Sequence, residues 1–183
     1  MKNIIIIFSF LFISISLNAQ KSQSRFDYRF GIGTSFLGTG DMRGIMYENE
    51  INCTINRYLS ASISLGYGKS DYGVSETASF LENNINMYFS PFKNIKRNDF
   101  RVGMGLSYLK ISDAYMSSAS WTNNELTDID YVFDLRKTFG CNIIIENTYS
   151  ITDKFLLGLK LYTQPYANGD INSGILLKLG VRL

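Results

Sequence analysis

Two glutamates, Glu48 and Glu50, have the clearest capacity for chemistry in this sequence. They lie two positions apart in a segment that alternates between apolar and polar residues. In a strand both therefore point to one face, about 7 Å apart. Paired carboxylates can bind a cation, or one of them can have a raised pKa and serve in acid–base catalysis. Alternatively, they pair with basic side chains in a protein interior, because a buried carboxylate needs a partner.

Charged residues of both signs occupy the polar phase of the other alternating segments as well. We predict that they form one internal network of ion pairs, since opposite charges enclosed in a narrow interior can pair. Its expected members are Asp27, Arg29, Glu48, Glu50, Glu82, Arg101, Glu146, Lys160, Lys178 and Arg182. We expect Asp27 and Arg182 to lie near each other at one rim, with Arg29 beside them and Lys178 deeper inside.

The composition excludes most catalytic and metal-binding chemistries. The sequence has no His, which rules out Ser-His-Asp and Cys-His catalysis and His metal ligands, and its 2 Cys cannot form a Cys₄ site. The acidic residues near position 128 lack the Gly and distal Glu of a calcium loop. We predict no catalytic residue, no cofactor and no metal site; a hydrolase that uses only carboxylates stays open as the enzymatic alternative.

The net charge of +2 does not favour nucleic acid as a partner. The N-terminal region has a separate composition: Lys2 precedes an apolar run over residues 4–17, and Asn18-Ala19 then ends in a small residue. This pattern is typical of a secretory signal peptide and is too short for a transmembrane helix. We expect a cleaved leader over residues 1–19 and a single domain over residues 20–183.

Apolar and polar residues alternate with a period of two through most of the remaining chain, which predicts strands. The alternating segments cover residues 26–36, 45–56, 61–68, 81–89, 100–108, 139–149, 155–162 and 174–183. We therefore expect an all-β fold with eight antiparallel strands of about 10 residues each. Residues 110–134, rich in Ser, Asn, Thr and Asp, are expected to form a long loop.

Eight antiparallel strands can close into a barrel, but alternation alone does not show whether the apolar side chains point into the barrel or outward. The polar phase is rich in Gly and Ser, which suit the narrow interior of an eight-stranded barrel. Aromatic residues gather near the segment ends, as expected at the two interfaces of a membrane. We therefore predict that the apolar phase faces lipid and that the first and last strands pair to close the barrel. A soluble, lipocalin-like binding barrel is the alternative.

The chain resembles the small eight-stranded outer-membrane β-barrel proteins of Gram-negative bacteria, of the OmpX and OmpA-transmembrane-domain type. The residues that carry this resemblance are the leader end Asn18-Ala19-Gln20, the segment Phe100 to Leu106, and the final segment Leu177 to Leu183. The resemblance implies a closed up-and-down transmembrane β-barrel in the outer membrane, in contact with outer-membrane lipid and the barrel assembly machinery.

The function that follows is a non-enzymatic structural or surface-interaction role. A surface ligand would be contacted through residues 110–134, since surface loops commonly carry binding residues. The alternative is a narrow channel or carrier for small hydrophobic molecules.

Overall fold

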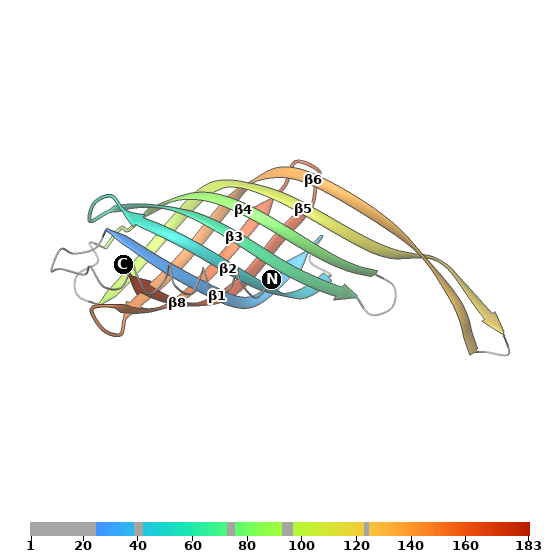
Figure 1. Cartoon of the computed structure of the whole chain (residues 1–183). Helices are drawn as coiled ribbons and strands as arrows, with labels where there is room; N and C mark the ends of the chain where they lie inside the picture. The colour runs from blue at the N-terminus through green and yellow to red at the C-terminus, as the bar shows by residue number, and fades with distance from the viewer. Residues whose placement is uncertain (1–24, 39–41, 73–75, 93–96, 123–124) are drawn as a thin grey trace, which may run out of the picture.

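A computed structural model describes residues 25–38, 42–72, 76–92, 97–122 and 125–183, and the predicted leader lies outside these residues. The strands are β1 (Phe26–Leu37), β2 (Met42–Thr54), β3 (Leu59–Tyr72), β4 (Glu76–Phe89), β5 (Asn98–Thr122), β6 (Glu125–Ser150), β7 (Phe155–Pro165) and β8 (Ile171–Arg182). Consecutive strands pair, so the sheet is a closed antiparallel up-and-down barrel (Figure 1). The predicted fold class and strand number are confirmed.

Pairing of the first and last strands closes the barrel. The register of β1 and β8 runs from Asp27 opposite Arg182 to Phe36 opposite Ser173. The amide of Leu183 donates to the carbonyl of Phe26 at 3.0 Å, so both ends of the barrel's chain meet at one rim, here called the terminal end. Closure satisfies the backbone groups that an open edge would leave unpaired.

The apolar phase of the strands faces outward, as predicted. Leu106 and Leu159 are 69% and 49% exposed, whereas charged side chains of the other phase are buried. The ambiguous run in β6 follows the same alternation, since Ile143 and Ile145 are exposed and Ile144 is fully buried. A lipocalin-like barrel keeps its apolar side chains inside, so that alternative is wrong for this chain. Within the described ranges, no helix is long and apolar enough to cross a membrane.

The prediction of a long loop over residues 110–134 is wrong. β5 and β6 have 25 and 26 residues and stay paired as far as Thr122 opposite Glu125, so this region is a β-hairpin. It projects far beyond the rest of the barrel, at the rim opposite the terminal end (Figure 1); we call this rim the hairpin end. β5 and β6 therefore far exceed the expected strand length of about 10 residues, whereas the other strands, with 11–14 residues, are close to it. Both faces of a projecting two-stranded ribbon are in contact with water, so this hairpin has the polar composition that is typical of a loop.

The barrel interior has two zones. Charged and amide side chains fill the part nearer the terminal end. Nearer the hairpin end, apolar side chains point inward, and together with Tyr88, which lies close to the terminal end, they form a buried cluster of Leu37, Met42, Met46, Ala78, Phe80, Tyr88, Leu109, Ile111, Ile144, Tyr162, Tyr166 and Leu176. Phe80 lies over Gly68, where a Cβ atom would collide with the ring. Small residues on one strand thus make room for large side chains on the next.

Candidate functional site

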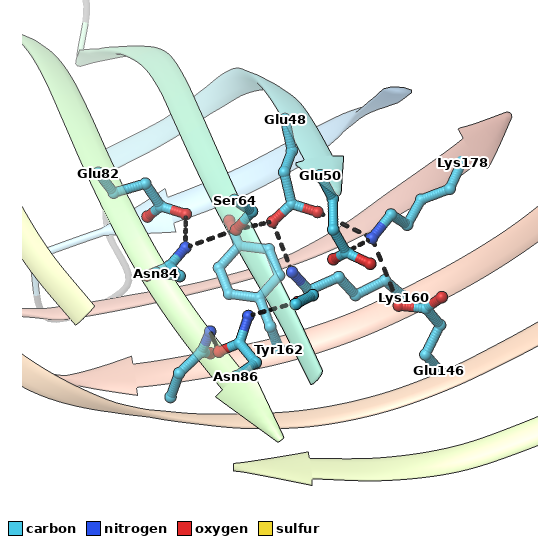
Figure 2. Close-up of polar contacts among 12 residues, drawn as sticks. Glu48, Glu50, Ser64, Glu82, Asn84, Asn86, Glu146, Lys160, Tyr162 and Lys178 are labelled. Carbon is cyan, nitrogen blue, oxygen red and sulfur yellow. Dashed lines mark hydrogen bonds and ion pairs between the residues drawn. The ribbon is translucent and has the colours of Figure 1, made fainter. Parts of the chain in front are cut away.

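The charged zone of the interior is the candidate site that the sequence singled out. Every predicted member except Arg182 is buried, with at most 6% of its surface exposed. Strand alternation places these side chains inside because each occupies the phase opposite the outward apolar residues. The close-up in Figure 2 shows six of these side chains, which come from different strands and point into the interior: Glu48, Glu50, Glu82, Glu146, Lys160 and Lys178.

Glu146 is the centre of the network near the terminal end. Its carboxylate accepts hydrogen bonds from Arg29, from Arg101 at 2.8 Å and from Thr148 at 3.1 Å. Arg29 also pairs with Asp27. One carboxylate therefore holds two guanidinium groups that come from β1 and β5, on opposite sides of β6 in the barrel order.

Lys178 connects Glu146 to the predicted carboxylate pair. Its Nζ atom lies 2.7 Å from Glu50, 3.0 Å from Glu48 and 3.4 Å from Glu146 (Figure 2). Lys160 donates to Glu48 at 2.5 Å. Both glutamates therefore have ammonium partners within the protein. This geometry matches internal ion pairing and leaves neither carboxylate as a free acid or base.

Arg101 joins the network to an aromatic side chain. Its guanidinium lies 3.2 Å from Glu50 and donates to Asn52 at 2.7 Å. The same group stacks on the ring of Tyr88, 3.9 Å from the ring centroid. Planar guanidinium groups suit simultaneous pairing and stacking, so Arg101 is fixed on several sides.

Glu82 differs from the other buried carboxylates. Among the residues that the structure describes, its hydrogen-bond donors are neutral amides: Asn84 at 2.9 Å, Asn172 at 3.0 Å and Gln164 at 3.5 Å. Among the described side chains, no Lys or Arg nitrogen lies within 4 Å of this carboxylate. The sequence pattern did not predict these amide partners, although each shares the inward phase of its strand.

Arg182 lies outside the buried network, contrary to the expectation from its phase. Its backbone is directly opposite Asp27, but its exposed side chain donates to Ser150 at 2.7 Å and to the carbonyl of Asp153 at 3.2 Å. The carboxylate of Asp27 instead forms an ion pair with Arg29. At the end of a strand the rim is open, so a long side chain can turn toward the neighbouring β6–β7 connection.

The base of the projecting hairpin holds a second group of ion pairs. Arg136 of β6 pairs with Asp113 of β5 and lies 3.0 Å from Asp170, in the connection between β7 and β8. Asp134 lies 3.9 Å from the same guanidinium. Arg136 thus attaches the hairpin to the barrel rim, a role that the sequence gave no separate signal for.

The hairpin has two different faces beyond the barrel rim. One face continues the outward apolar phase and exposes Tyr131, Phe133 and Leu135, with Phe133 77% exposed. The other face of β6 has Asp130 and Asp134 on either side of the exposed Val132, and Asp130 accepts a hydrogen bond from Ser118 at 2.8 Å. The described side chains include no group of three or more acidic or cysteine residues placed to hold a metal ion.

Comparisons with known proteins agree with this architecture. No protein-family model and no curated protein sequence matches the chain. Neisserial surface protein A has a similar structure, with a TM-score of 0.62, 11% identity, and coverage of 88% of this chain and 98% of that one. Ail, the attachment invasion locus protein of Yersinia pestis, has a TM-score of 0.58, 8% identity, and coverage of 88% and 100%.

The outer membrane protein OprG of Pseudomonas aeruginosa is a third similar structure, with a TM-score of 0.53, 8% identity, and coverage of 86% and 93%. Ail has also been crystallised with the heparin analogue sucrose octasulfate. At these identities the similarity concerns the fold. This chain has the fold of the small eight-stranded outer-membrane β-barrels.

Proposed function

We propose that this protein is a non-enzymatic integral protein of the bacterial outer membrane. Its barrel crosses the bilayer, and its projecting hairpin makes contacts at the cell surface. The observation that carries this proposal is the combination of an exposed apolar belt with a buried, ion-paired interior. Exposure of such an apolar surface to water is unfavourable. Hydrocarbon can cover it, because a closed barrel has no strand edge with unpaired backbone groups.

The belt has the height expected for a membrane. Along β5 the outward aromatic residues are Phe100 near the terminal end and Tyr108 near the hairpin end. Eight residues at about 3.4 Å each, tilted by about 40°, span about 21 Å along the barrel axis. The apolar band of outer-membrane barrels is about 25 Å high. Exposed residues between these limits include Met104 at 72% and Leu106 at 69%.

The filled interior favours an anchor over a channel or carrier. Ion pairs occupy one zone, and the apolar cluster occupies the other. An eight-stranded barrel has only enough internal space for its side chains. A carrier for small hydrophobic molecules would need an internal apolar cavity, and side chains such as Phe80 and Leu109 occupy that position here.

Export and assembly complete the proposal. Residues 1–19 would act as the cleaved leader, and residues 20–183 would then insert with the help of the barrel assembly machinery. In this orientation the terminal end faces the periplasm and the hairpin end faces the outside. The hairpin over residues 110–134 would contact the surface ligand, because it extends beyond the membrane and exposes apolar side chains together with Asp130 and Asp134.

Membrane fractionation with gel electrophoresis tests this proposal. The full chain should be recovered from the outer-membrane fraction and should migrate faster on a denaturing gel before boiling than after boiling. In planar bilayers the purified protein should give no currents of porin size. Recovery in a soluble fraction, with a single migration position at both temperatures, would contradict membrane insertion; large steady currents would favour the channel alternative.

A further inference from the structure

We propose that Lys110 and Lys137 bind the phosphate group of a lipid on the outer wall of the barrel. The two residues are register partners on β5 and β6, and both are exposed. They share the outward phase of their strands, so their side chains leave the barrel on the same side. This inference rests on the proposed insertion in the outer membrane.

Two like charges directly opposite each other destabilise a pair of strands. The strand order offers no compensation on the same face: β4 places Leu81 opposite Lys110, and β7 pairs with β6 as far as Ile143, beyond which an isolated bridge joins Gly140 to Tyr166. The nearby acids Asp113 and Asp134 have the inward phase and lie at Arg136. Among the described side chains, neither lysine has an ion-pair partner. A bound anion would neutralise this repulsion.

The next outward positions toward the membrane centre have the complementary apolar character. Tyr108 lies opposite Phe139, with ring centroids 4.9 Å apart, and Leu106 lies opposite Cys141. The same two strands therefore present a cationic pair, an aromatic pair and then aliphatic surface. This order matches a single lipid molecule, with its phosphate at the lysines and its acyl chains along the belt. It distinguishes a lipid from a free anion.

The distribution of outward charges supports this location. Arg43 of β2 and Lys69 of β3 are also exposed and have the outward phase near the hairpin end. At the terminal end, the corresponding outward strand positions in the described chain are uncharged: Phe26, Leu59, Phe89, Phe100, Tyr149, Phe155 and Val181. Cations beside a membrane are attracted to anionic headgroups. The outward cations on the strands themselves therefore lie at the hairpin end, whereas exposed cations of the terminal end, such as Arg57 and Lys154, lie in the connections between strands.

Native mass spectrometry of the full chain, folded in detergent, tests the site. The probe is bis-phosphorylated lipid A, compared with a diacylglycerol of similar chain length. The double variant Lys110→Gln/Lys137→Gln should retain lipid A about 30-fold less strongly than the natural protein, from about 1 kcal/mol per lysine. The matched control is Lys154→Gln, an exposed lysine in the connection between β6 and β7, which should retain lipid A within about twofold of the natural protein.

Three results would overturn the inference. These are equal retention of lipid A by the double variant, equal retention of lipid A and diacylglycerol by the natural protein, and displacement of lipid A by millimolar inorganic phosphate alone. All variants should show the same heat-dependent gel shift, which reports a folded barrel. Absence of that shift from the natural protein would contradict the proposed function itself, whereas a normal shift without phosphate preference would contradict only the lipid site.

Discussion

The variants Glu146→Gln and Glu82→Gln provide a matched test of the internal network. Both carboxylates are fully buried, and both substitutions remove one charge with almost no change in volume. They differ in their partners. Glu146 contacts the cationic groups of Arg29, Arg101 and Lys178, whereas Glu82 accepts hydrogen bonds from neutral amides.

The expected costs follow from these contacts. Removing one partner of a buried ion pair leaves the other charge uncompensated and costs about 3–5 kcal/mol. We expect this loss for Glu146→Gln. For Glu82→Gln, two contributions to stability oppose each other: the hydrogen bonds from the amides become weaker, but a buried charge without an ion-pair partner is removed. We expect its net effect on unfolding free energy to lie within about 1 kcal/mol of zero.

Urea titration of the protein in lipid vesicles, followed by the heat-dependent gel shift, measures the difference. With a slope of about 2 kcal/mol per molar urea, a loss of about 4 kcal/mol lowers the midpoint by about 2 M. Glu82→Gln should move it by less than about 0.5 M. Equal midpoint shifts for the two variants would refute the assignment of distinct roles to these carboxylates.

Three further predictions follow from the fold. Leu106→Arg and Leu159→Arg should each lower the free energy of unfolding in vesicles by about 2–4 kcal/mol, because they place a charge in hydrocarbon. Ser107→Arg should instead act by crowding Tyr166 inside the barrel, whose hydroxyl lies 2.9 Å from Ser107. Equal urea midpoints for all three variants would contradict the outward and inward assignments. Replacing residues 117–130 by Asn-Gly, between the register partners Met116 and Tyr131, should preserve the heat-dependent gel shift and reduce cell-surface binding in an adhesion assay. Loss of the gel shift would show that the barrel needs the hairpin in order to fold. Gly68→Ala should lower the free energy of unfolding by about 1–3 kcal/mol, because the added Cβ collides with the Phe80 ring. Gly31→Ala, whose added Cβ would have its nearest neighbour at 3.4 Å, should change the urea midpoint little. A larger midpoint shift for Gly31→Ala than for Gly68→Ala would refute this packing.

Strand alternation was sufficient to predict the barrel because each strand has an apolar outer face and a polar inner face. The phase of β1 and β8 even placed Asp27 beside Arg182 in the register. The side chain of Arg182 nevertheless binds the β6–β7 connection. Phase fixes the direction in which a side chain leaves the strand, but the partner at an open rim depends on which neighbours are already occupied.

The hairpin escaped prediction because its residues meet water on both faces. Tyr131, Val132 and Phe133 have high β-propensity, but they stand among Asp and Ser residues that are common in loops. The amide partners of Glu82 were also missed. Asn172 and Gln164 lie far from Glu82 in the sequence, and only closure of the barrel brings them together.

Cys141 provides the most direct test of the central claim that the apolar face of the barrel meets lipid. This thiol is free and exposed, and its register partner is Leu106 in the middle of the belt. A spin label attached to it in a Cys53→Ser variant can be compared in vesicles with a label at Asp153→Cys, in an exposed turn. We predict that oxygen dissolved in lipid relaxes the label at Cys141 strongly and a water-soluble nickel chelate relaxes it weakly, with the reverse order at position 153. Strong relaxation of the Cys141 label by the nickel chelate would contradict membrane insertion.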